Sequence, residues 1–269
     1  MEVAKVGVGV DPETMDISEF SLDNRLHIYD SPGLGDTTER DQIHEKKIRE
    51  LLRKKDSRGN AVIDLVLVIV DGSSRDMGTT FSLLENVIIP ELGEECNERL
   101  LVAINQADVA MKGKHWDAEN NCPDPVLNDY LQARAISIQK RIMQNTGIRV
   151  DPIYYSAGYK EEGMEQMPPY NLSKLLVYIL RAIPPVKRLV IAENLNQDNL
   201  NFEHSDQAED YHGEIVKSLI ECVVAGAGAG GQIGTKIGTA IAGSVGAVVG
   251  RTIGTVIGAI GGLLGGLFG

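Results

Sequence analysis

Short apolar runs alternate with longer amphipathic segments from residue 26 to residue 183, and this alternation constrains the fold more than any other feature. Four runs rich in Val, Ile, Leu or Tyr predict strands at residues 26–29, 62–70, 100–104 and 153–155. Four segments with apolar residues three and four positions apart predict helices at residues 39–55, 79–92, 126–145 and 172–183. This order predicts an α/β fold, with a mostly parallel sheet and helices on both of its faces.

Two polar motifs directly follow predicted strands, where parallel sheets bind their ligands. In DSPGLGD, residues 30–36, the Asp30 carboxylate can hold a water of Mg²⁺, and Gly33 lets a backbone N–H approach a phosphate. In NQAD, residues 105–108, the Asp108 carboxylate can accept two N–H bonds from the edge of guanine, while Asn105 orients the loop and reaches the ring.

A third motif, Ser156-Ala157-Gly158, follows the last predicted strand, and its small residue would let a backbone N–H reach the purine carbonyl. Taken alone, each of the three motifs is also an ordinary turn after a strand. Their order, each closing a separate strand, favours a nucleotide site.

This combination resembles the TRAFAC-class P-loop GTPases of the Era-like group, whose third to fifth signature motifs are DxPG, NKxD and SA. The resemblance covers residues 1–185. The pattern YNL-K-LL-YI-L-AIP at residues 170–184 is similar to that of predicted GTPases from prophage islands of enteric bacteria. The resemblance implies a GTP-binding switch that takes GTP or GDP with Mg²⁺.

The resemblance also implies residue roles. Asp30 and Gly33 would serve Mg²⁺ and the γ-phosphate, and Asn105, Asp108 and Ala157 would read guanine. Thr14, in VGVGVDPET, is the candidate for the switch threonine that closes over Mg²⁺. An ordinary loop threonine remains the alternative.

Three departures weaken the expected activity. Gln106 replaces the lysine of NKxD, and Leu34 stands where some relatives carry a water-orienting glutamine. The 269 residues contain no G-x-x-x-x-G-K-[ST] loop, and Lys112-Gly113-Lys114 does not follow a strand. We therefore expect a truncated or degenerate G domain that lacks the strand between those ending at Asp30 and Asp71, with weak binding and hydrolysis near background.

The net charge of −12 disfavours nucleic acid as a partner, because phosphate binding requires a basic surface. The three cysteines show no CxxC or Cys/His spacing, which indicates neither a disulfide framework nor a zinc site. The first twenty residues carry acids and no long apolar run, so a secretory signal is not expected and a cytoplasmic location fits.

The composition changes near residue 224, because residues 225–269 hold 16 of the 29 glycines and only two charges, Lys236 and Arg251. We expect a G domain at residues 1–185, a polar linker at 186–210, and a helix with a glycine-zipper-like tail at 211–269. Small residues recur every four positions in this tail, a spacing typical of closely packed membrane helices. They are Gly230, Gly234, Gly238, Ala242, Gly246, Gly250, Gly254, Gly258, Gly262 and Gly266.

Two other functions remain open. The tail could associate with membranes or with itself, and the body would then only regulate it; a flexible Gly/Ala tail that self-associates is the plainer form of this alternative. A ribosome-associated factor is suggested by members of the Era-like group. The 24 basic and 38 acidic residues of the body make that alternative less attractive.

Overall fold

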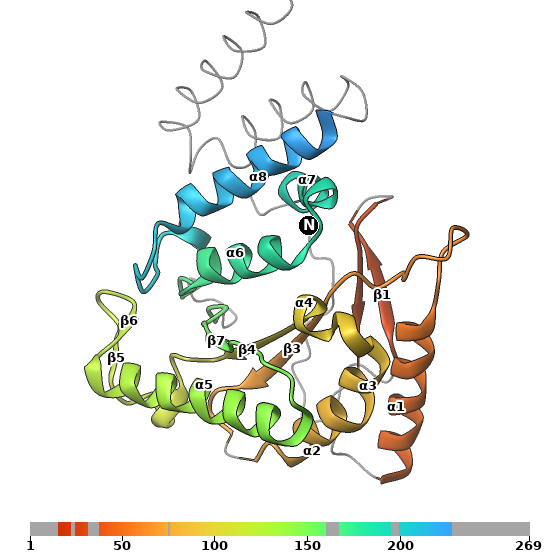
Figure 1. Cartoon of the computed structure of the whole chain (residues 1–269). Helices are drawn as coiled ribbons and strands as arrows, with labels where there is room; N and C mark the ends of the chain where they lie inside the picture. Colours follow the sequence, from red (N-terminus) through yellow and green to blue (C-terminus); the bar gives the residue numbers. More distant parts are fainter. Residues whose placement is uncertain are drawn as a thin grey trace, which may run out of the picture. The chain divides into compact units, whose positions relative to one another are not determined.

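The computed structural model describes residues 16–22, 25–31, 38–74, 76–159, 167–194 and 199–227 (Figure 1). The chain divides into two compact units. Met1–Trp116 and Pro123–Tyr154 form the first unit, and Asp117–Cys122 and Tyr155–Gly269 form the second. The expected domain boundary at residue 185 therefore lies inside the second unit.

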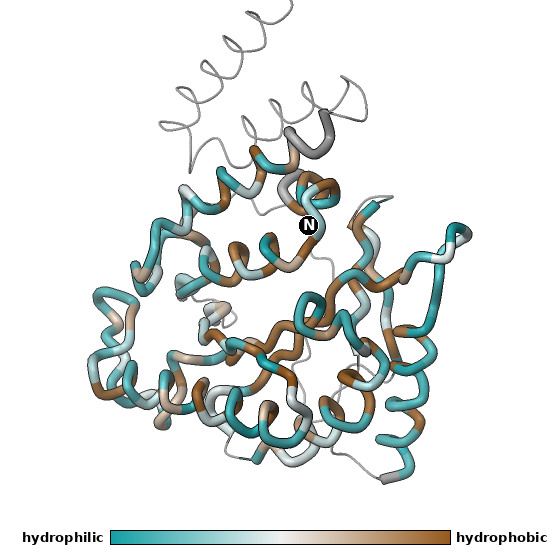
Figure 2. Tube along the Cα trace, viewed as in Figure 1, coloured by the Kyte–Doolittle hydropathy of each residue, from teal (hydrophilic) through white to brown (hydrophobic). Residues whose placement is uncertain are grey.

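A three-stranded parallel sheet forms the centre of the first unit. Its strands are β3 (Val66–Asp71), β4 (Leu100–Asn105) and β7 (Ile153–Tyr154), in the order β3-β4-β7. The hydrophobic colouring follows β3 and β4 along their length (Figure 2), as is typical of parallel strands. The predicted α/β class is confirmed at this level.

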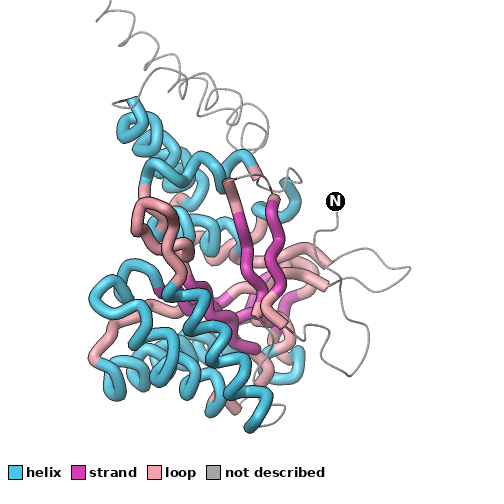
Figure 3. Tube along the Cα trace, turned by 90° about the vertical axis from the view of Figure 1, so that its right-hand side faces the viewer, coloured by secondary structure: helices cyan, strands magenta, loops and turns pink. Residues whose placement is uncertain are grey.

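A separate antiparallel hairpin lies earlier in the same unit and consists of β1 (Ser18–Ser21) and β2 (His27–Asp30) (Figure 3). The apolar run at residues 26–29 predicted β2, whereas β1 was not predicted. No described strand joins β2 to β3. Ile28 in β2 is 47% exposed and Ile69 in β3 is 55% exposed, so each strand presents an apolar side chain to solvent.

The helices between the strands largely follow the predicted ranges. α1 (Thr38–Arg53) matches its prediction, whereas the helix predicted at residues 79–92 is divided into α2 (Gly78–Leu83), a π-helical turn (Leu84–Ile88) and α3 (Ile89–Leu92). Pro90 explains the division, because proline lacks the N–H of an α-helical hydrogen bond and displaces the preceding turn. A 3₁₀ turn (Gly93–Glu95) and α4 (Cys96–Arg99) lead into β4.

The long helix α5 (Pro125–Thr146) connects β4 to β7 and has clear end signals. The Asp124 side chain caps its start by accepting the Leu127 N–H at 3.0 Å, and Pro125 occupies the first turn. Gly147 ends it in the left-handed conformation, with φ 72°. A 3₁₀ turn (Ala110–Gly113) and the short strands β5 (Trp116–Asp117) and β6 (Cys122–Pro123) precede this helix.

In the second unit the structure describes three α-helices: α6 (Leu172–Ala182), α7 (Arg188–Glu193) and α8 (Tyr211–Ala227). Short 3₁₀ turns lie at Pro185–Lys187 and Asn199–Phe202. Apolar side chains from all three helices share one buried cluster: Leu176, Val177, Leu180, Leu189, Tyr211, Ile215, Val216, Leu219 and Cys222. The segment expected as a polar linker at 186–210 therefore contains α7 and contributes Leu189 to a core.

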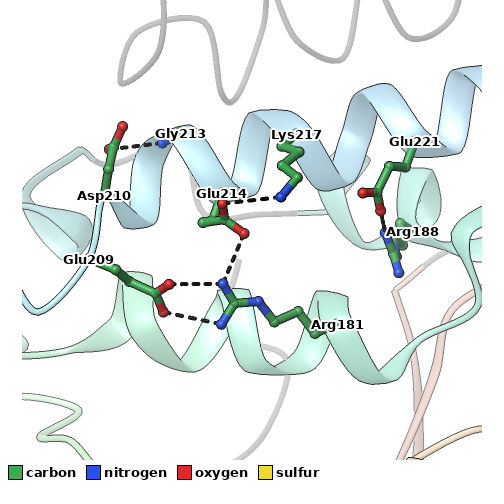
Figure 4. A network of polar contacts seen from close by, with 8 residues as sticks. All are labelled: Arg181, Arg188, Glu209, Asp210, Gly213, Glu214, Lys217 and Glu221. Atoms are coloured by element: carbon green, nitrogen blue, oxygen red, sulfur yellow. Dashed lines mark hydrogen bonds and ion pairs between the residues drawn. The ribbon is translucent and has the colours of Figure 1, made fainter.

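Ion pairs and hydrogen bonds connect these helices at the surface of the cluster (Figure 4). Arg181 of α6 donates to both carboxylate oxygens of Glu209 at 3.1 and 2.9 Å, and also to Glu214 at 2.9 Å. Arg188 of α7 donates to Glu221 of α8 at 2.6 Å. Arg188 and Glu209, two polar residues of the segment expected as a linker, thus form contacts with neighbouring helices.

Candidate functional site at the carboxyl ends of β3 and β4

The last residues of β3 and β4, Asp71 and Asn105, lie side by side in the parallel register. The next residue, Gly72, is buried and donates its N–H to the Asn105 carbonyl at 2.8 Å. A Cβ on Gly72 would lie 2.5 Å from that oxygen and 3.0 Å from the Gln106 carbonyl oxygen, so no larger residue fits this backbone position. The two strand ends are therefore held together beyond the sheet itself.

The loop at residues 71–74 is ordered by side-chain hydrogen bonds. The Asp71 carboxylate accepts the Ser73 N–H at 2.7 Å and the Ser73 hydroxyl at 2.8 Å. Arg134 of α5 donates from Nη2 to the Asp71 carbonyl at 2.9 Å and also to the Ser74 carbonyl. A guanidinium with two carbonyl acceptors fixes the path of this loop against α5.

The turn at residues 105–108 carries the predicted guanine-reading residues. Gln106 is left-handed, with φ 60°, a conformation that disfavours any residue with a side chain. Its carbonyl accepts the Val109 N–H at 3.3 Å and the Ala110 N–H at 3.2 Å, while Ala107 is fully buried. The backbone strain at Gln106 is thus sustained by the contacts around it.

Asp108 is half-buried on this turn. No hydrogen bond or ion pair connects its carboxylate to any residue that the structure describes. A partly buried carboxylate loses hydration without gaining a protein donor, which makes it available to a ligand that carries N–H groups.

Of the residues expected to hold Mg²⁺, Asp30 belongs to a different sheet from the strand that precedes this turn. Asp30 ends β2 in the hairpin and is exposed, paired in register with Ser18. Gly33, Leu34 and Thr14 lie outside the described residues. Within the described ranges no group of three or more His, Cys, Asp or Glu side chains could hold a metal ion. Asp30 therefore fits only a Mg²⁺ that takes most of its ligands from water and phosphate, as Mg²⁺ commonly does.

The Ser156-Ala157-Gly158 motif belongs to the second unit. Ser156 is buried and forms a two-way backbone bridge with Tyr170, at 3.0 and 2.9 Å. Ala157 is exposed. Gly158 has φ 76°, and a Cβ there would lie 2.3 Å from the Met167 carbonyl oxygen, so glycine is required.

Asn121, which also belongs to the second unit, supports the segment that pairs with this motif. Its buried side chain donates to the carbonyls of Pro168 and Pro169 at 3.1 and 3.0 Å, directly before Tyr170. Burial raises the pKa of Tyr155 to about 12, so this tyrosine stays protonated beside the motif at neutral pH.

The structure brings Asn105 and Asp108 together on one turn and leaves Asp30 on a separate sheet and Ser156 and Ala157 in another unit. The sequence motifs did not indicate Gly72, Arg134 or Asn121. A glycine after a strand ending in Asp was a usable signal for Gly72. Arg134 and Asn121 act through residues distant in sequence and carried no local signal.

No described helix has the length and apolar character needed to cross a membrane. The small-residue ladder at residues 230–266 lies outside the described residues. Comparisons with protein-family models, with curated proteins and with solved structures find no match to this chain.

Proposed function

We propose that this chain is a guanine-nucleotide-binding protein of the Era-like type, in which Asp108 reads the base. The observation that carries the proposal is the half-buried Asp108 carboxylate, which has no described partner and lies on a turn held in a strained conformation. A carboxylate accepts the adjacent N1–H and amino N–H donors of guanine, whereas adenine does not offer that pair of donors.

The arrangement of strands supports the same proposal. Under this proposal the hairpin β1-β2 and the parallel sheet β3-β4-β7 would be two parts of a P-loop GTPase sheet, with no described strand between β2 and β3. Among the described strands, β2 pairs only with β1, and β3 pairs only with β4, which leaves one edge of each strand available for the strand that such a gap lacks.

Asp30 would hold a water of the Mg²⁺ that accompanies the nucleotide, and the ion would neutralise phosphate charge. Weak binding is expected, because no lysine-bearing phosphate loop occurs in the 269 residues. Base recognition would then contribute a large share of the affinity.

Calorimetry of the full chain with GDP and ADP tests the proposal. GDP should bind more tightly than ADP. Asp108→Ala should weaken GDP binding by about 10- to 100-fold, because that is the loss of affinity expected when hydrogen bonds to a charged group are removed. Asp129→Ala is the matched control, because Asp129 is an exposed aspartate of α5 in the same unit. Equal affinity for GDP and ADP, or an Asp108→Ala variant that binds like the control, contradicts the proposal.

A second proposal concerns the tail. Residues 225–269 would mediate self-association or membrane association through the ladder of small residues at every fourth position. The regular spacing is the observation that favours it, because glycine otherwise destabilises a helix in water by about 1 kcal/mol per residue relative to alanine.

A further inference from the structure

Gly72 connects the loop after β3 to the turn after β4. Its N–H donates to the Asn105 carbonyl at 2.8 Å, and the position where its Cβ would stand is only 2.5 Å from the same oxygen. Real Cβ atoms do not approach an oxygen so closely, so any side chain at this position moves the Asn105 carbonyl or breaks the hydrogen bond.

The 71–74 loop resists moving in response. Arg134 holds its Asp71 and Ser74 carbonyls from α5, and the Asp71 carboxylate holds Ser73. A side chain on Gly72 would therefore displace the 105–108 turn rather than the loop.

The 105–108 turn transmits such a displacement to Asp108. Gln106 follows the Asn105 carbonyl directly and is left-handed, and its own carbonyl lies 3.0 Å from the position of a Gly72 Cβ. Asp108 is only two residues further along the chain.

We propose that Gly72, in the loop held by Arg134, is a positioning residue that sets base specificity by fixing the 105–108 turn and with it the Asp108 carboxylate. This inference rests on the proposed guanine-binding function. It assigns part of that specificity to residues outside the three motifs that indicated it.

The test compares GDP with inosine 5′-diphosphate, which lacks the amino group of guanine and so loses one hydrogen bond to Asp108. In the unaltered full chain the Kd for inosine 5′-diphosphate should exceed that for GDP by about 10-fold. This ratio is informative because a partly unfolded variant weakens both ligands equally, and the loss cancels. A displaced carboxylate instead lowers the ratio.

Gly72→Ala should reduce the ratio to less than about 3-fold, since a misplaced carboxylate gains little from the amino group. Gly78→Ala is the matched control, because a Cβ at Gly78 meets only the Asp76 carboxylate, at an ordinary 3.4 Å. The control should keep the ratio of the unaltered chain.

Arg134→Gln tests the same inference without adding a group to the strand ends, and it remains informative if Gly72→Ala does not fold. It should lower the ratio as well. Arg141→Gln is its control on α5, because Arg141 stacks on the Phe81 ring instead of holding the loop.

The outcomes separate the two proposals. Absence of GDP binding, or a ratio in the unaltered chain that Asp108→Ala leaves unchanged, overturns the guanine-binding function and this inference with it. A ratio that depends on Asp108 but survives in both Gly72→Ala and Arg134→Gln overturns this inference alone. A Gly78→Ala variant that lowers the ratio as much as Gly72→Ala also overturns this inference alone.

Discussion

The Lys174 ammonium lies 2.6 Å from an oxygen of the Asp206 carboxylate, and the two side chains are only 16% and 13% exposed. Asp206 also accepts the Tyr211 hydroxyl at 2.6 Å, and its own N–H donates to the buried Asn171 side chain at 2.8 Å. The pair therefore ties the start of α6 and the start of α8 to the segment between α7 and α8.

Lys174→Ala should destabilise the second unit by about 3 kcal/mol, because it leaves a mostly buried carboxylate without its cation. Lys217→Ala is the control: Lys217 is 65% exposed and lies 3.5 Å from Glu214, so its loss should change stability by less than about 1 kcal/mol. Hydrogen exchange of the α6 and α8 amides measures both. Equal protection in the two variants would contradict the structural role of the pair.

The same pair predicts a pH dependence at the acid end. Burial opposes ionisation of Asp206, but hydrogen bonds from Lys174 and Tyr211 outweigh it and hold the pKa of this carboxyl below its ordinary value of 3.8. A lowered pKa stabilises the fold above 3.8, and the benefit disappears as the pH falls through the folded value. The stability difference between the unaltered chain and Asp206→Asn should thus be constant from pH 7 to about 5 and shrink at lower pH.

Urea unfolding followed by circular dichroism at pH 7, 5, 4 and 3 tests this dependence. A difference that already shrinks between pH 7 and pH 5 would mean that another group controls it.

Arg181 and Arg188 of the second unit should differ in how much they stabilise the fold, although both form short ion pairs (Figure 4). The Arg188 side chain is 9% exposed and donates to the Ile183 carbonyl at 3.0 Å as well as to Glu221. The Arg181 side chain is 44% exposed. Arg188→Ala should cost about 3 kcal/mol, whereas Arg181→Ala should cost about 1 kcal/mol or less. Losses of similar size in the two variants, measured by urea unfolding, would show that burial does not decide the effect.

The strands β3 and β4 could be predicted because their runs are short, rich in Val, Ile and Leu, and apolar almost without interruption. β1 could not, because SEFS contains a single large apolar residue and its pairing with β2 depends on the turn between them. α7 was missed for a related reason. The polar residues around it make contacts in the folded chain that composition does not reveal.

In the candidate site, the residues at strand ends could be predicted from the sequence, whereas the residues that support them could not. Asp30, Asn105 and Asp108 end strands or follow them closely, and strand ends can be read from apolar runs. The support for the 105–108 turn could not be read, because Arg134 and Asp71 lie 63 residues apart in the sequence. Such pairings arise only when α5 packs beside the parallel sheet.

The purified 269-residue chain should hydrolyse GTP at a rate near background. The phosphate-binding loop motif and its lysine do not occur in these residues, and that lysine stabilises transferred phosphate charge in P-loop enzymes. A phosphate-release assay with Mg²⁺ measures the rate, with Asp30→Ala as the comparison. Turnover at ordinary GTPase rates that disappears in Asp30→Ala would show that another segment replaces the loop.

Association through the tail should depend on its small residues and not on its two charges. A small residue at every fourth position from residue 230 to residue 266 would form a stripe along one side of a helix. If two helices approach closely along that stripe, the packing between their backbones offsets the stability that glycine otherwise costs a helix. Bulky side chains on the stripe should therefore prevent specific oligomers.

Gly246→Leu combined with Gly250→Leu separates packing from simple hydrophobicity, because the two mechanisms predict opposite signs. Added leucines make the tail more apolar, so simple partitioning predicts stronger binding to liposomes, while packing along the stripe predicts loss of oligomers. Crosslinking and liposome flotation of the full chain measure the two effects separately. Replacing Lys236 and Arg251 with glutamine is the control, and it should leave the oligomers unchanged. If oligomers instead persist in the double leucine variant, the tail associates through apolar surface alone, without the close packing that its glycines would allow.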